Sequence, residues 1–167
     1  GVDYNSKRDI IVNKRSFTIC GGASLFLQGI ISRTTRDIDV VGNEIDAILT
    51  DAAILVANDL GLNPKWLNSD PKGLAKDMRK GWESRVFLVY SETNLQIFSI
   101  SREDMIFSKF YAYCDRQKDI DDLVALNVSL YEIKEAYELT LKKDGNPLWP
   151  KHVESQLVKL KKRMGYE

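Results

Sequence analysis

The pattern of apolar and polar residues divides the chain into an N-terminal half of strands and helices and a C-terminal half of helices alone. Short apolar or alternating runs predict strands, and apolar residues that recur every three or four positions predict helices. Strands are predicted at residues 16–20, 36–41, 85–90 and 95–100, the last two as a hairpin. Helices are predicted at residues 23–31, 43–60, 102–114, 116–126, 129–142 and 148–164. This order predicts a small α/β (α+β) fold followed by a helical part.

Residues that favour helix ends support several of these boundaries. Asn43 is predicted to cap the helix that follows it, and Gly61 is predicted to end that helix. Ser101 and Ser129 are each followed three positions later by an acidic residue, an arrangement that resembles a capping box.

Residues 62–84 contain two prolines and two glycines and are predicted to form a long loop with a short helix at 74–80. Loops of this length are often functional. Residues 1–100 are expected to form the α/β core, and residues 101–167 a helical part packed against it.

Composition excludes several classes of protein. Hydrophobic residues make up 44% of the chain, which suits a folded core and argues against disorder. The 24 basic and 24 acidic residues cancel, so no overall positive field indicates nucleic-acid binding. Neither Cys20 nor Cys114 lies in a CxxC pair and His152 is distant from both in sequence, which argues against a zinc site or a disulfide framework. No apolar stretch of membrane-spanning length and no signal-peptide pattern occurs, so a soluble cytoplasmic protein without membrane contact is expected.

Asp37 and Asp39 are the strongest candidates for chemistry. Residues i and i+2 of a strand point to the same face, so the two carboxylates are expected to project together. Two carboxylates on one face repel each other unless a cation lies between them, and carboxylate oxygens are natural ligands of Mg²⁺. We therefore expect Asp37 and Asp39 to hold Mg²⁺, with Mn²⁺ as the alternative. A lone Asp-x-Asp is more often two exposed strand carboxylates, so the interpretation depends on the neighbouring residues.

The Gly21-Gly22 pair supplies the second half of the candidate site. It falls between a predicted strand and a predicted helix, where glycine lets a phosphate approach the backbone and the helix N-terminus offers free N–H groups. Ser24 is a candidate to add a hydroxyl, and Arg33 and Arg36 to offset the carboxylate charge or to hold phosphate. A strand, Gly-Gly, a helix, a basic connection and Asp-x-Asp on a strand, in that order, favour a metal site that handles phosphate.

The motifs Cys20-Gly21-Gly22 and Asp37-Ile38-Asp39 resemble those of the nucleotidyltransferase superfamily of the DNA polymerase β type. The longer string, which includes Arg33 and Thr35, is similar to the AbiEii/MenT group of toxin-type nucleotidyltransferases, and more narrowly to the DUF6036 relatives. The resemblance extends over about residues 16–126. It implies a small mixed β-sheet flanked by helices.

The resemblance also implies roles for residues of the helical part. Relatives carry a lysine shortly after an aspartate, and a later aspartate on a neighbouring helix. By this resemblance Lys109 contacts the nucleotide phosphates and takes part in catalysis, and Asp122, or alternatively Asp119, is the late acid. Structural roles stay open as well: Asp104 can be a helix cap, Lys109 can extend its amine from an apolar helix to solvent, and the aspartates can form a solvated helix face.

Two features depart from the resemblance. Polymerase-like relatives carry a third carboxylate on a later strand, where this chain has the neutral Gln96; toxin-type members also lack that acid. The general base is therefore unassigned among Asp39, a late aspartate and water. Ala23 follows the glycines where close relatives often have Thr. Trp66 and Trp82 flank the long loop, and packing is favoured over stacking on a base.

The patterns and the resemblance together imply transfer of a nucleoside monophosphate from an NTP to an acceptor hydroxyl, with release of pyrophosphate. The resemblance implies an RNA acceptor such as a tRNA 3′ end, and a toxin–antitoxin or phage-defence setting with an antitoxin partner. Two alternatives remain open: an enzyme that adenylylates a protein, and a non-catalytic module that binds a nucleotide or a partner.

Overall fold

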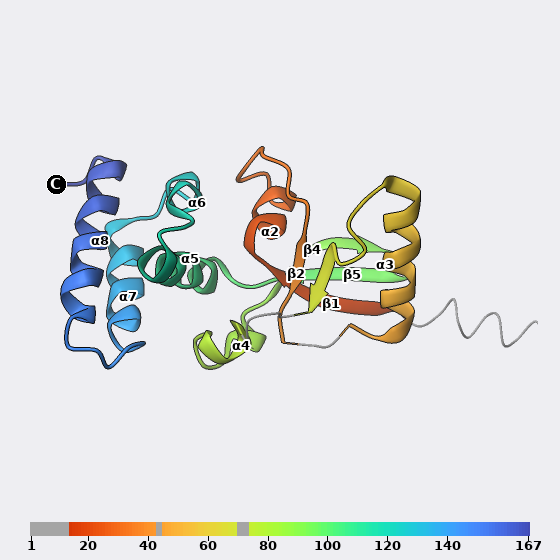
Figure 1. Cartoon of the computed structure of the whole chain (residues 1–167), viewed down its shortest axis with the longest axis horizontal. Helices are drawn as coiled ribbons and strands as arrows, with labels where there is room; N and C mark the ends of the chain where they lie inside the picture. The colour runs from red at the N-terminus through yellow and green to blue at the C-terminus, as the bar shows by residue number, and fades with distance from the viewer. Residues whose placement is uncertain (1–13, 43–44, 70–73) are drawn as a thin grey trace, which may run out of the picture.

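The computed structural model describes residues 14–42, 45–69 and 74–167 (Figure 1). The strands in these ranges are β1 (Arg15–Cys20), β2 (Ile38–Val40), β3 (Leu67–Ser69), β4 (Phe87–Glu92) and β5 (Leu95–Ser99). The helices are α2 (Gly21–Leu27), α3 (Ala47–Leu60), α4 (Leu74–Asp77), α5 (Arg102–Arg116), α6 (Ile120–Ala125), α7 (Leu130–Leu141) and α8 (Trp149–Met164), with a 3-10 turn η1 (Trp82–Ser84). The predicted α+β fold with a mixed sheet is confirmed.

Strand β1 lies at the centre of the sheet, whose order is β3-β2-β1-β5-β4. β1 runs antiparallel to β2, with Cys20 beside Asp39, and parallel to β5. β3 was not among the predicted strands; it runs parallel to β2 and places Asn68 beside Asp39. A strand of three residues is too short to show an alternating pattern, which is why the sequence does not indicate it.

Two helices are shorter than predicted because backbone conformation interrupts them. α2 ends at Leu27 rather than at residue 31, since Gly29 adopts a left-handed φ of +72°. α6 begins at Ile120 rather than at residue 116, since Gln117 and Asp119 have φ of +58° and +72°. The connection between α5 and α6 is therefore a sharp turn and not helix.

The helix caps agree in part with the sequence. The capping box at Ser129 is confirmed, and Ser101 accepts the backbone N–H three residues later. α3 begins at Ala47, where the Asp46 carboxylate accepts the Leu49 N–H at 2.8 Å. The predicted cap Asn43 lies outside the described residues.

One hydrophobic core joins the sheet half to the helical half. Leu25 of α2 and Val41, after β2, pack in the same buried cluster as Ile100 and the fully buried Phe110 of α5. Figure 1 shows α5 to α8 gathered at one end of the molecule, α3 against the sheet at the other, and α2 and α4 between them. The cluster that crosses this junction fixes how residues from the two halves face each other.

Both tryptophans next to the long loop pack against the protein. Trp66 donates its indole N–H to the Ala53 carbonyl at 2.8 Å, and Trp82 is buried against Gly42. None of the described helices combines the length and the apolar character needed to cross a membrane.

Candidate functional site

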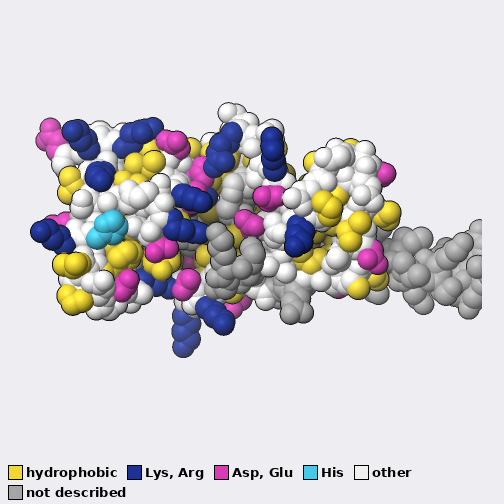
Figure 2. Space-filling view, viewed as in Figure 1, with side chains coloured by type: hydrophobic (Ala, Val, Ile, Leu, Met, Phe, Trp, Pro, Cys, Tyr) yellow, Lys and Arg dark blue, Asp and Glu magenta, His cyan; other side chains and the backbone are white. Residues whose placement is uncertain are grey.

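A cavity of about 620 Å³ opens between the start of α2, the end of β2 and the connection from α5 to α6. A volume of this size is typical of small-molecule sites. In Figure 2, acidic and basic side chains are interspersed around the middle of the face, where the helical part meets the sheet half. The lining residues are Cys20, Gly21, Gly22, Arg33, Thr35, Asp37, Asp39, Val40, Leu74, Asp77, Ser108, Lys109, Tyr111, Asp115, Arg116, Lys118 and Asp119.

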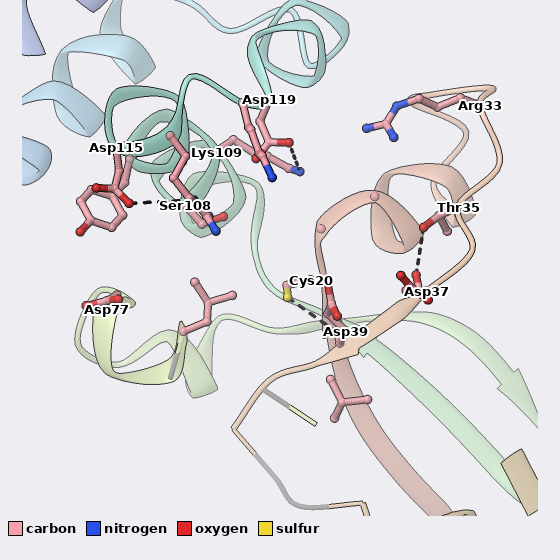
Figure 3. Close-up of a pocket in the computed structure, with 17 residues that line it drawn as sticks. Cys20, Arg33, Thr35, Asp37, Asp39, Asp77, Ser108, Lys109, Asp115 and Asp119 are labelled. Carbon is pink, nitrogen blue, oxygen red and sulfur yellow. Dashed lines mark hydrogen bonds and ion pairs between the residues drawn. The ribbon is translucent and has the colours of Figure 1, made fainter. Parts of the chain in front are cut away.

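Asp37 and Asp39 both line this cavity (Figure 3), and the residue between them does not. Ile38, between them, packs against the core cluster of the sheet. Asp37 is exposed and directly precedes β2, and Thr35 Oγ1 donates to its carbonyl at 2.9 Å. Asp39 is half-buried next to Gly21. The alternation expected of a strand therefore brings the two carboxylates to one cavity.

The donor set of these two residues fits a hard divalent cation. Two carboxylates leave most of the coordination positions of Mg²⁺ to water and to substrate phosphate, which is how Mg²⁺ is usually bound. Among the described residues no group of three or more His, Cys, Asp or Glu side chains is arranged to hold a metal, so this pair does not form part of a larger cage. The site suits a cation that arrives with a phosphate substrate.

The turn at Gly21 and Gly22, called here the glycine corner, leaves open space beside the carboxylates of Asp37 and Asp39. Gly21 has a φ of +69°, which L side chains rarely adopt, and an added Cβ would lie 3.8 Å from Asp39 Oδ2. An added Cβ at Gly22 would lie 3.8 Å from Thr35 Oγ1 and 3.9 Å from the Arg33 guanidinium. A ligand can therefore reach the backbone here and contact Arg33 at the same time.

Ser24 does not reach the cavity, although the sequence made its hydroxyl a candidate phosphate contact. The side chain is fully buried, and its hydroxyl is hydrogen-bonded to the Ser99 hydroxyl and accepts from Gln28 Nε2 at 2.9 Å. Position 24 of α2 faces β5 and not the open end of the helix. The glycine corner therefore has only its backbone, and no hydroxyl from Ser24, to offer a phosphate.

Lys109 and Asp122 belong to a cluster of charges at the helical side of the cavity. Lys109 Nζ lies 2.8 Å from Asp122 Oδ2 and 3.3 Å from Asp119 Oδ1, and Arg33 Nη2 donates to Asp122 Oδ1 at 2.6 Å. Lys109 is buried in these ion pairs and does not extend to bulk solvent. Burial opposes ionisation of Asp122, but the hydrogen bonds from Lys109 and Arg33 outweigh it and lower the pKa of the carboxyl. Asp122 thus stays charged behind the cavity.

Asp104 has a structural role. Its fully buried carboxylate accepts two hydrogen bonds from Arg85, at 2.8 and 2.9 Å, and one from the Ser101 hydroxyl at 2.7 Å. It does not line the cavity. These contacts fasten the segment before β4 to the first turn of α5, which favours the structural interpretation of this residue.

Gln96 is distant from the paired carboxylates in the sheet. Gln96 lies on β5 opposite Ser16, and β5 is separated from β2 by β1. The strand that adjoins Asp39 on its other side is β3, where the register partner of Asp39 is Asn68. Asn68 is also neutral, so neither strand next to β2 places a carboxylate directly beside Asp39.

Several lining residues carry no sequence signal for a site. The sequence analysis assigned no site role to five residues that line the cavity: Asp77, Tyr111, Asp115, Arg116 and Lys118. They come from α4, α5 and the α5–α6 turn, and Figure 3 shows Asp77 and Asp115 at the end of the cavity away from Asp37. Only the packing of these helices on the core brings them together.

Comparison with known proteins gives one match. A family model described as "Nucleotidyltransferase of unknown function (DUF6036)" matches residues 5–139, which is more than half of the chain. No curated protein and no solved structure matches significantly.

Proposed function

Because the chain belongs to the DUF6036 family of nucleotidyltransferases of unknown function, we propose that it transfers a nucleoside monophosphate from an NTP to an acceptor hydroxyl with the help of a divalent cation. One observation carries the proposal: Asp37 and Asp39 share a cavity with the Gly21-Gly22 corner and with Arg33. The carboxylates suit a cation, the corner suits a phosphate, and the guanidinium suits the charge of a triphosphate.

Each part of the cavity has a role in this reaction. Asp37 and Asp39 would hold Mg²⁺ or Mn²⁺, which when bound would neutralise triphosphate charge and favour ionisation of the attacking hydroxyl. The backbone at Gly21 and Gly22 cradles the β- and γ-phosphates, since no side chain blocks their approach. Arg33 and Lys109 oppose the negative charge of the same phosphates.

The transfer is a displacement at the α-phosphorus. A bond forms between the acceptor oxygen and the α-phosphorus, and the bond from that phosphorus to the α–β bridging oxygen breaks. Pyrophosphate leaves with the bridging oxygen, and the proton of the acceptor hydroxyl passes to a base, for which the Asp39 carboxylate and water are the candidates. Most of the catalysis is then positioning and charge stabilisation, which fixed side chains around a cavity can supply.

An RNA 3′ end is the acceptor we propose, in a toxin–antitoxin or phage-defence setting. Arg116 and Lys118 are exposed and line the cavity, so they offer cations to a phosphodiester backbone. This local pair makes an RNA contact compatible with a chain whose total charge is zero.

The test combines each labelled NTP with total RNA and with cell protein in the presence of Mg²⁺. Wild-type protein is expected to label RNA, and Asp39→Asn to lower the rate by roughly 10²-fold or more, since a metal contributes several kcal/mol of charge stabilisation. Asp51→Asn, an exposed carboxylate on α3 that does not line the cavity, serves as the matched control and is expected to keep full activity. Label on protein alone would replace RNA as the acceptor. Nucleotide binding without transfer by the wild type would contradict the catalytic proposal.

A further inference from the structure

The carboxylate of Asp122 lies behind the cavity and not in it. The residue is 1% exposed and is absent from the cavity wall, whereas Arg33, Lys109 and Asp119 around it all line the cavity. Each of its oxygens faces one cation: Oδ1 accepts from Arg33 and Oδ2 pairs with Lys109. A ligand in the cavity can therefore contact Arg33 and Lys109 but not the carboxylate of Asp122.

These cations come from different halves of the molecule. Arg33 lies on the connection between α2 and β2, Lys109 on α5, and Asp122 on α6. Without the carboxylate between them, the guanidinium and the ammonium would repel each other and nothing described would fix their separation. With it, the charges of Arg33, Lys109, Asp119 and Asp122 cancel, so the cluster is stable before any ligand arrives.

Holding the two cations does not use up their hydrogen-bond donors. A guanidinium has five N–H groups, of which one donates to Asp122 from Arg33 Nη2. The side chain of Arg33 remains 58% exposed, so its other donors can reach a ligand. Lys109 has three N–H groups and two acidic partners, which leaves one N–H for a phosphate oxygen.

We propose that Asp122 is a positioning residue: it aims Arg33 and Lys109 together at the triphosphate and neither binds the metal nor acts as the base. This inference rests on the proposed function. Two observations oppose the other roles. Both oxygens of Asp122 already face cations, and the cavity wall lies in front of the residue. A carboxyl whose pKa is lowered by two cations is also a poor proton acceptor near neutral pH.

A double-mutant cycle tests the proposal through the KM for NTP. Asp122→Asn and Arg33→Gln are each expected to raise KM by about tenfold or more, the effect of losing an ordered charge-assisted hydrogen bond. The KM of the double variant is expected to rise by much less than the product of the two single increases, because Asp122 acts through Arg33. Asp121→Asn is the matched control, since Asp121 lies one position earlier on α6, is exposed, and pairs with Arg163. Its KM is expected to be unchanged.

Three results would overturn the proposal. Increases in KM that multiply in the double variant would show that Asp122 acts independently of Arg33. Disappearance of the acidic limb of the kcat–pH profile in Asp122→Asn would make it the base. A changed Mg²⁺ requirement in that variant would make it a metal ligand.

Two complications have separate remedies. If Asp122→Asn does not fold, the cycle is built from Asp122→Glu and Arg33→Gln, because Glu keeps the charge but displaces the two oxygens by one methylene; the KM increases should again fail to multiply, and increases that multiply would refute the proposal. If the wild type transfers nothing, the proposed function fails. The same cycle can then be measured by calorimetry, as Kd values for inorganic tripolyphosphate in the presence of Mg²⁺. Losses of affinity that multiply in the double variant would refute the positioning role.

Discussion

Replacing Gly22 by alanine should change stability and activity in opposite directions. Gly22 is the second residue of α2, its φ is not in the left-handed region, and an added Cβ meets nothing closer than 3.8 Å. Alanine favours helix over glycine by about 0.5–1 kcal/mol, so the melting temperature should rise by roughly 1–4 °C. The fold itself therefore tolerates the change.

The same methyl group would stand where a phosphate is expected. It would lie 3.8 Å from Thr35 Oγ1 and 3.9 Å from the Arg33 guanidinium, in the space through which a ligand reaches the backbone. Loss of one hydrogen bond from a backbone N–H to a charged phosphate costs roughly 1.5–3 kcal/mol, which corresponds to roughly a 10- to 150-fold weaker affinity.

The assay measures the melting temperature by differential scanning fluorimetry and the Kd for MgNTP by calorimetry. Gly145→Ala is the control, because no atom lies within 4 Å of an added Cβ at that position and the residue does not line the cavity. Its affinity should match the wild type. Unchanged affinity in Gly22→Ala would refute the phosphate cradle, and a lowered melting temperature would refute the account of the local geometry.

Three further outcomes are expected. Gly42→Ala should lower the free energy of unfolding by about 2–5 kcal/mol in urea denaturation, because the residue has a φ of +82° and an added Cβ would overlap the Trp82 ring at 2.4 Å. Gly29→Ala is the control, since Gly29 also has a positive φ but no neighbour within 4 Å, and it should lower the free energy of unfolding by less. Equal losses in the two variants would refute the overlap with Trp82. The pKa of Asp122 is lower in the native than in the unfolded state, so its stabilising effect is complete above about pH 4 and is lost as the pH falls through the native pKa. Urea denaturation between about pH 2 and pH 5 should therefore show a smaller acid-induced loss of unfolding free energy in Asp122→Asn than in the wild type. Burial raises the pKa of the Cys114 thiol to about 12, so a disulfide reagent at pH 8 should modify it only after unfolding, and rapid labelling of the native protein would contradict this.

Local features of the chain could be predicted because their causes are local. The Gly-Gly corner and the Asp-x-Asp pair each lie within a few residues, and the alternation of a strand is enough to place Asp37 and Asp39 on one face. The capping box at Ser129 is likewise a contact over three residues. Family membership could be predicted from the same motifs, because their order and their spacing along the chain can be read from the sequence.

Features that depend on pairing between distant segments were missed or misplaced. Strand β3 exists because three residues pair with β2, and this pairing places the neutral Asn68 beside Asp39. Ser24 has the right residue type and spacing for a phosphate contact, but the packing of α2 turns it toward Ser99. A short pattern in one segment cannot specify such a partner, because the free energy of pairing depends on the side chains of both segments.

The sequence by itself therefore determined the α+β class, the paired carboxylates, the glycine corner and the family. Tertiary structure alone decided that residues 89 positions apart, Arg33 and Asp122, share a hydrogen bond, and that Lys109 meets the same buried acid. It also decided that Asp77, Asp115 and Lys118 complete the cavity wall. The physical reason is that strand alternation and turn geometry act between neighbours in the chain, whereas burial and ion pairing act between surfaces that meet only when the helical part packs on the sheet.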